Sequence, residues 1–188
     1  MASQVDICNL ALVRLGQDTI AAMYPTEQST EARLATGLWT PVLRSALRSH
    51  PWNFALATAE LTPTNDTPPD FTYEYQLPTD CVRALRLVNA TYGTYKIRAE
   101  DKLVTNQEDA VLEYVAMVTD TTKFDDQFIE ALSYRLAADL SLPLTGNAQM
   151  FSAMMKAYSN TVTMARQTDA QEIRPTDPAG TSILNSRL

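Results

Sequence analysis

The sequence predicts an α+β fold that is mainly α: a four-helix bundle with an inserted antiparallel β-sheet and an extended C-terminal arm. Apolar residues recur at helical spacing in four stretches, and a central stretch alternates between apolar and polar residues as a half-buried strand does. Residues 169–188 follow neither pattern. We therefore expect a domain over 1–168, with its bundle at 3–56 and 124–168 and its β-rich insertion at 57–119, followed by the arm.

The composition is typical of one soluble globular domain. The chain has 188 residues, 45% of them hydrophobic and 20% charged. No stretch reaches the roughly 20 apolar residues of a membrane span, so no membrane anchor is expected. The N-terminus lacks the basic region and apolar core of a signal peptide. A net charge of −7 without any Lys/Arg run argues against tight binding to a nucleic-acid backbone.

The two cysteines, Cys8 and Cys81, are far apart in the sequence and have no metal-ligand or redox spacing. Free thiols in a reducing cytoplasm are therefore favoured over a disulfide.

The first predicted helix covers residues 3–15. Ser3 is suited to its N-cap, Asp6 completes a capping-box-like start, and Gly16 is placed to end it.

The second predicted helix begins at Ser29 and contains Pro41. A proline at this place either kinks the helix or splits it in two. The apolar positions stay in phase across it, which favours a kink. These positions are Ala32, Ala35, Trp39, Val42 and Ala46.

The β-rich region begins with residues 55–61, which fit either a strand or a helical extension, and a loop is expected over 62–69. Residues 71–77 then alternate, with Phe71, Tyr73, Tyr75 and Leu77 on one face. Further strands are expected at 83–89, 95–99, 103–104 and 110–118, which makes a meander of four or five strands. Its aromatic face is expected to cover the helices or a neighbouring copy.

Two more helices follow, over 125–141 and 148–167. Asp125 or Asp126 suits the start of the first, and Pro143 and Gly146 are expected to end it. The second has a heptad-like seam for packing on the other three helices. The seam residues are Phe151, Met155, Tyr158, Val162 and Ala165.

The corner between the second helix and the β-rich region joins the two halves of the domain. It consists of His50, Pro51, Trp52, Asn53 and Phe54. Pro51 fixes its own φ and pushes His50 out of the helical region. Trp52 and Phe54 offer a large apolar area, so we expect a buried corner with a structural role.

No catalytic, cofactor-binding or metal-ligating constellation stands out. The chain has one histidine, no phosphate-binding glycine motif and no cluster with metal-ligand spacing. Carboxylate pairs such as Asp125-Asp126 stand at the edges of elements, where helix capping explains them. A scaffold or interaction protein without a cofactor is therefore expected rather than an enzyme.

Several motifs, in their order along residues 4–168, carry a resemblance to a known family. They are Ile7-Cys8-Asn9-Leu10-Ala11-Leu12 with Leu15-Gly16, Ser29-Thr30-Glu31-Ala32, Leu47-Arg48-Ser49-His50-Pro51-Trp52-Asn53-Phe54-Ala55, Tyr75-Gln76-Leu77-Pro78-Thr79-Asp80-Cys81, and the helix from Phe124 to Leu140. Together they resemble the tail tubular protein A family, the head-to-tail adaptors of short-tailed, T7-like bacteriophages.

This resemblance implies a structural virion protein at the head-tail interface, assembled in the cytoplasm of the bacterial host. Members form a dodecameric ring that joins the portal protein to the tail nozzle or another tail protein, such as tail fibres. The ring continues the DNA channel for genome retention and ejection, and DNA passes through the lumen without specific binding.

The resemblance also gives the arm over 169–188 a role, because such adaptors grip the portal with an extended C-terminal segment. The expected apolar anchors are Ile173, Ile183, Leu184 and Leu188, and the ionic ones are Arg174 and Arg187.

Alternatives stay open at this point. The chain could be an adaptor of a long-tailed phage or of a gene transfer agent with the same fold. A virion-associated cell-wall hydrolase would depend on His50. Arg44 and Arg48, four residues apart on the polar side of their helix, indicate either a solvated face or a contact with a ring neighbour.

Overall fold

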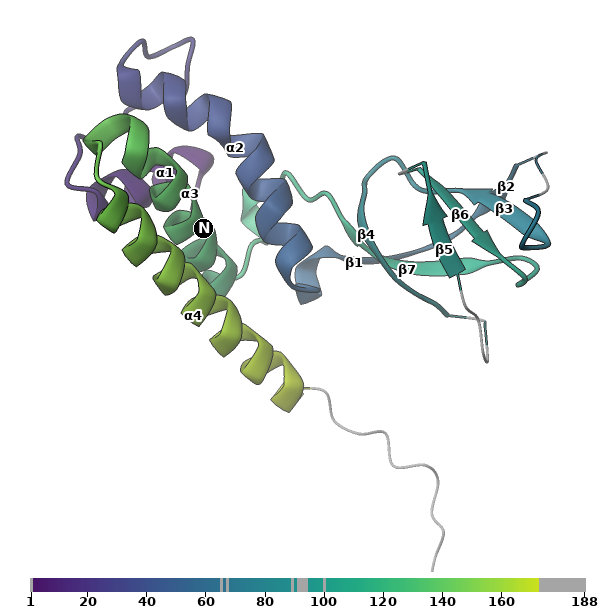
Figure 1. Cartoon of the computed structure of the whole chain (residues 1–188). Coiled ribbons are helices and arrows are strands. Elements are labelled where there is room, and N and C mark those ends of the chain that lie inside the picture. The colour runs from purple at the N-terminus through teal and green to yellow at the C-terminus, as the bar shows by residue number, and fades with distance from the viewer. Residues whose placement is uncertain are drawn as a thin grey trace, which may run out of the picture.

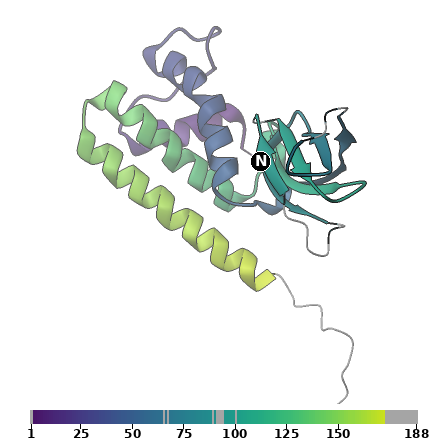
Figure 2. The same cartoon turned by 45° about the vertical axis from the view of Figure 1, so that its right-hand side comes forward.

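A computed structural model describes residues 2–172, except for 65, 67, 89, 91–94 and 100, and leaves out the side chains of 169–172. Helices form one part of the molecule, the helical lobe, and strands form the other, the β lobe (Figures 1 and 2). The helices are α1 (Gln4–Arg14), α2 (Thr30–Ser49), α3 (Asp126–Thr145) and α4 (Ala148–Glu172).

Helix α3 is the centre of the helical lobe. It contacts each of the other three helices, and α4 runs along it (Figures 1 and 2). Much of its surface is apolar and buried, and a helix that is apolar on several sides needs neighbours on several sides. Helix α4 packs mainly on α3 and also contacts the end of α2, where Arg166 donates a hydrogen bond of 2.9 Å to the Ser49 carbonyl, whereas an even packing on the other three helices was expected. The buried apolar residues of α3 are Phe128, Ala131, Leu132, Leu136, Ala137, Ala138 and Leu140.

The helix starts follow their capping residues. Ser3 and Asp6 form a capping box at α1, and the Asp125 side chain accepts a hydrogen bond of 2.6 Å from the Phe128 N–H at α3. Helix α2 is continuous across Pro41, and all five apolar positions predicted for it are buried.

The ends of α3 and α4 differ from the prediction. Pro143 lies inside the last turn of α3, which ends at Gly146 with φ +65°, a conformation that suits glycine. Helix α4 continues beyond residue 167 to Glu172. A proline near a C-terminus removes only one hydrogen bond of the last turns, so the predicted end near residue 141 is too early.

The prediction of a mainly α chain with one inserted meander is wrong, because the β lobe contains two separate antiparallel sheets. One has three strands in the order β1-β7-β4, and the other has four in the order β2-β3-β6-β5. Alternation identifies a strand but not its partner, and β1 pairs with β7 across the whole insertion. The strands are β1 (Leu56–Glu60), β2 (Thr62–Pro63), β3 (Tyr73–Gln76), β4 (Cys81–Leu87), β5 (Tyr95–Arg98), β6 (Lys102–Thr105) and β7 (Val111–Ala116).

The two sheets share a core of their own. Tyr75 and Leu77 from the alternating stretch pack with Leu103 of β6 and with Leu112 and Tyr114 of β7. The aromatic face therefore covers the other sheet rather than the helices, the first of the two expected partners. The helical lobe has a second, larger core around Trp52 and α3.

Both cysteines are free, with Cys8 buried in the helical core and Cys81 half-buried at the start of β4. Among the described residues, no helix combines the length and apolar character needed to cross a membrane.

Candidate functional site: the junction of the two lobes

The junction is formed where the chain leaves α2 and enters β1. Helix α2 ends at Ser49, His50 is extended, and a 3-10 turn over Asn53–Ala55 leads into the strand. The φ restraint of Pro51 and its effect on the preceding residue explain why the helix stops here.

Trp52 fastens this corner to the helical core. Its side chain is 2% exposed, and its indole N–H donates a hydrogen bond of 3.1 Å to the Ala46 carbonyl. Its ring meets that of Phe128 edge-on, with centroids 5.0 Å apart. Phe54 and Phe124 pack against the same Phe128 ring, at 4.9 Å and 4.8 Å. Aromatic pairs of this geometry stabilise beyond the area that they bury, so these contacts hold the corner against α3.

His50 belongs to the same aromatic cluster. It is 6% exposed, and its ring stands perpendicular to Trp52 at a centroid distance of 5.0 Å. A general base must reach a substrate, and this imidazole lies inside the protein. The hydrolase alternative therefore gains no support from the position of His50.

Two arginines join α2 to β4. Arg48 Nη1 donates a hydrogen bond of 2.6 Å to the Val82 carbonyl, and Arg83 Nη1 donates one of 3.3 Å to the Arg48 carbonyl. Each lobe thus supplies a guanidinium to the backbone of the other.

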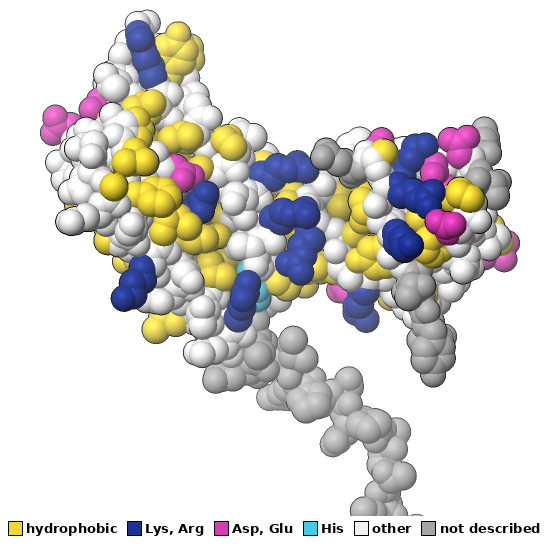
Figure 3. All heavy atoms as spheres, viewed as in Figure 1, with side chains coloured by type: hydrophobic (Ala, Val, Ile, Leu, Met, Phe, Trp, Pro, Cys, Tyr) yellow, Lys and Arg dark blue, Asp and Glu magenta, His cyan; other side chains and the backbone are white. Residues whose placement is uncertain are grey.

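These arginines open onto a cavity of about 590 Å³, which we call the arginine hollow. Lys and Arg side chains gather on the surface where α2 meets the sheets (Figure 3). The hollow combines three cations with a partly apolar wall. Its lining residues are Arg44, Arg48, Leu77, Cys81, Val82, Arg83, Ala84 and Ile97.

The Cys81 thiol lies beside these charges but does not become reactive through them. Burial and the negative charge of Asp80 raise its pKa, and the nearby Arg44 and Arg48 only partly oppose this rise. Asp80 also accepts a hydrogen bond of 3.1 Å from the Tyr114 hydroxyl, whose pKa is raised to about 12, first by burial and then by Asp80. The thiol is therefore protonated at neutral pH.

A smaller cavity of about 310 Å³ lies beside the corner, between the start of α3 and the end of α4. Gln127 donates a hydrogen bond of 3.4 Å to the Thr168 hydroxyl across it. Its lining joins aromatic and acidic side chains. These are Trp52, Asn53, Phe54, Asp125, Asp126, Gln127 and Thr168.

The structure brings together the five corner residues singled out in the sequence. The expected portal-binding residues, Ile173, Arg174, Ile183, Leu184, Arg187 and Leu188, lie outside the described residues. Within the described part of the chain, no group of three or more His, Cys, Asp or Glu is placed to hold a metal ion.

Sequence reasoning found only half of the arginine hollow. The four-residue spacing of Arg44 and Arg48 placed them together on α2, but nothing in the strand pattern indicated that Arg83 and Ile97 join them. That meeting depends on how the β lobe packs against α2.

Comparison with models of known protein families and with curated proteins finds no match.

Proposed function

We propose that this chain is a structural virion protein without enzymatic activity, the head-to-tail adaptor of a short-tailed, T7-like bacteriophage. Twelve copies form a ring that joins the portal protein to the tail nozzle or another tail protein and continues the DNA channel. The ring holds the genome in the head and allows its ejection. The proposal begins with the ordered motifs along residues 4–168 that resemble the tail tubular protein A family.

The observation that carries the proposal is the position of the most distinctive motif, Leu47–Ala55. It forms the junction between two lobes that each have their own hydrophobic core. Trp52 and Phe54 lock this junction onto α3. A subunit with two distinct hydrophobic cores suits a protein that must contact one partner above it and another below it.

The end of α4 suits the proposed role of the arm. Its last turns extend beyond the other helices (Figures 1 and 2). The chain continues from there into residues 173–188, which carry the expected portal anchors. We place portal binding on this segment.

The proposal is tested by mixing the chain with the portal protein of the same virus and imaging the product by electron microscopy. We expect a ring of twelve subunits on one face of the portal. A chain cut after Glu172, which keeps α4 whole, should no longer bind portal. A chain with 173–188 in shuffled order is the matched control for length and charge, and it should fail in the same way.

Two results would contradict the proposal. Absence of a ring on the portal would refute the adaptor function, and unchanged portal binding by the shortened chain would refute the role of the arm. Binding of duplex DNA by the assembled ring should be weak, since the chain carries a net charge of −7. Tight, strongly salt-dependent duplex binding would refute the view that DNA passes through the channel without being bound.

An adaptor of a long-tailed phage or a gene transfer agent would give the same ring. An image of the whole particle separates these carriers, because it shows the tail directly.

A further inference from the structure

The arginine hollow concentrates positive charge without a carboxylate partner among the described residues. Arg44 and Arg48 stand one helical turn apart on α2, and Arg83 comes from β4. Arg48 and Arg83 each donate one hydrogen bond to a backbone carbonyl, and Arg44 makes none within the described part of the chain. A guanidinium has five N–H donors, so most donors of this cluster are open to a ligand.

The other cations on the described strands are all provided for within the chain. Arg86 pairs with Glu113, Arg98 with Asp70, and Lys102 with Glu74 and Asp66, while Lys96 lies over the Phe71 ring. The chain has 22 acidic residues against 15 basic ones. Three arginines without an ion pair therefore gather at one place, beside strands whose other cations all have a partner.

The walls of the hollow indicate what kind of anion fits. Leu77, Val82 and Ile97 line it beside the arginines, and Ile97 is 43% exposed. A polypeptide segment offers both carboxylates and aliphatic side chains to such a site. A DNA backbone offers phosphates without apolar surface, and it is bound along extended basic tracks rather than in one hollow.

We propose that the arginine hollow receives carboxylate side chains from a second copy of this chain. The inference rests on the proposed ring, and it names the chemistry of the contact between neighbouring subunits. Two acidic copies repel each other over most of their surfaces, and this hollow is a place where the acidic surface of one is attracted to the other.

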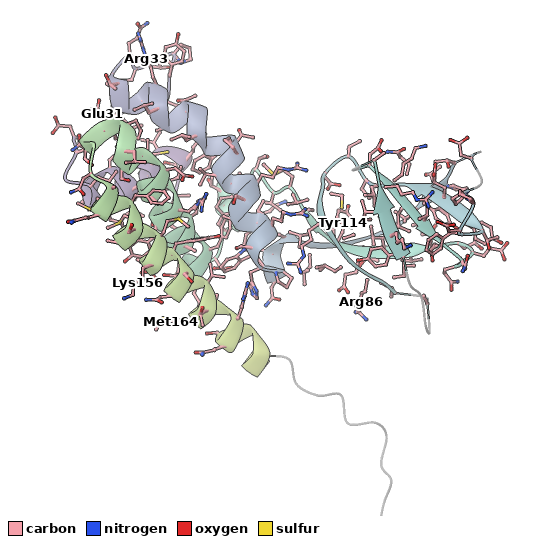
Figure 4. All side chains as sticks on the ribbon, viewed as in Figure 1. Glu31, Arg33, Arg86, Tyr114, Lys156 and Met164 are labelled. Carbon is pink, nitrogen blue, oxygen red and sulfur yellow. The ribbon has the colours of Figure 1, made fainter. Side chains whose placement is uncertain are left out.

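The chain has carboxylates suited to this role. Glu31, Asp126 and Glu130 form no ion pair with the described residues. Glu31 lies at the end of the helical lobe away from the sheets (Figure 4), so it reaches an arginine hollow only on another copy. A contact between two different surfaces is heterologous, and repetition of it closes into a ring when the rotation permits.

Charge reversal at Arg44 tests the contact, because among the described residues this arginine forms no hydrogen bond or ion pair between the two lobes. Arg44→Glu should weaken association between subunits by on the order of tenfold or more, since it places like charges in contact. Lys156→Glu makes the same charge change on an exposed part of α4 (Figure 4) and should leave association unchanged. Sedimentation of the free chain and ring formation on portal provide the two readouts.

Crosslinking identifies the partner directly. Arg44→Lys keeps the positive charge and introduces an amine that a carbodiimide joins to a carboxylate in contact with it. We mix this variant in its ordinary and its ¹⁵N-labelled form and digest the crosslinked product. Position 44 should be joined to an Asp- or Glu-containing peptide carrying the other isotope label. Crosslinks confined to one label would overturn the proposal.

The outcomes separate this inference from the proposed function. Rings on portal that tolerate Arg44→Glu and give no mixed-label crosslink at position 44 would overturn the inference and leave the adaptor intact. Mixed-label crosslinks in a chain that forms no ring on portal would support the contact and refute the adaptor. If the wild-type chain binds duplex DNA and the Arg44→Glu variant does not, phosphate is the occupant of the hollow. This result would also overturn the inference.

Discussion

Replacing Trp52 by alanine should lower the free energy of unfolding of the helical lobe by about 4 kcal/mol. A buried tryptophan removes roughly 150–250 Å² from water, which at about 25 cal/mol/Å² gives an upper bound of about 4–6 kcal/mol. Measured truncations of buried aromatic residues cost about 3–5 kcal/mol. Trp52 belongs with these, because its side chain is 2% exposed and packs edge-on against Phe128.

Loss of the hydrogen bond from the Trp52 indole to the Ala46 carbonyl adds little to the cost of Trp52→Ala. The Ala46 carbonyl that accepts from the Trp52 indole also accepts a hydrogen bond of 2.7 Å from the Ser49 hydroxyl. The carbonyl therefore keeps a partner in the variant, and the loss stays near the low end of about 0.5–1.5 kcal/mol. Trp52→Phe should for the same reason be much milder than Trp52→Ala.

Urea unfolding, monitored by far-ultraviolet circular dichroism, measures the change in the free energy of unfolding. This signal comes mainly from the helices. Met164→Ala is the control, because Met164 is 67% exposed on α4 (Figure 4) and its truncation should change stability by no more than about 0.5 kcal/mol. A loss below about 1 kcal/mol for Trp52→Ala would refute the view that this corner holds the helical lobe together.

Three further predictions concern the separate cores, the ion pair of the β lobe and the thiols. Leu103→Ala removes a fully buried side chain between the two sheets and should lower the stability of the β lobe by about 2–5 kcal/mol. Hydrogen exchange should become faster in β6 but not in α3, and equal acceleration in both would show one shared core. The hydrogen bond of 2.7 Å from Lys102 lowers the pKa of Glu74 below its ordinary value of 4.5, so this carboxylate stabilises the fold fully above pH 4.5 and loses its effect as the pH falls through the lowered pKa. Urea midpoints of the wild type and Glu74→Gln should therefore differ at neutral pH and converge in acid, and a constant difference would contradict the linkage. Burial raises the pKa of the Cys8 thiol to about 12, so a thiol reagent should leave Cys8 unmodified in the native protein and react only slowly, at the half-buried and protonated Cys81. Release of a second equivalent without denaturant would be inconsistent with a closed helical core.

Local chemistry made much of the helical lobe predictable. Ser3 with Asp6 and Asp125 cap their helices through side chains within three residues of the groups that they satisfy, so neighbouring sequence suffices to find them. The phase of the apolar face identified the buried side of α2 across Pro41 for the same reason. The corner was also visible, because a proline followed by two aromatic residues restricts the backbone and demands burial.

The β lobe was not predictable in the same way. The strand at 71–77 was visible in its alternation, but the pairing of Leu56 with Val115 joins residues from opposite ends of the insertion. Alternation tells which side chains share a face and leaves the partner of that face open. The two sheets cover each other, and this arrangement removed the need for the helices or another copy to cover the aromatic face.

The sequence by itself determined the four helices, the starts of the first three, the buried corner at Trp52 and the acidic balance of the chain. Tertiary structure alone decided that the strands form two sheets, that α3 is the central helix, and that Arg83 meets Arg44 and Arg48 in one hollow. The physical reason is the range of the interactions. Capping and helical periodicity act within a few residues, whereas strand pairing and the meeting of charges from different elements depend on the packing of the whole chain.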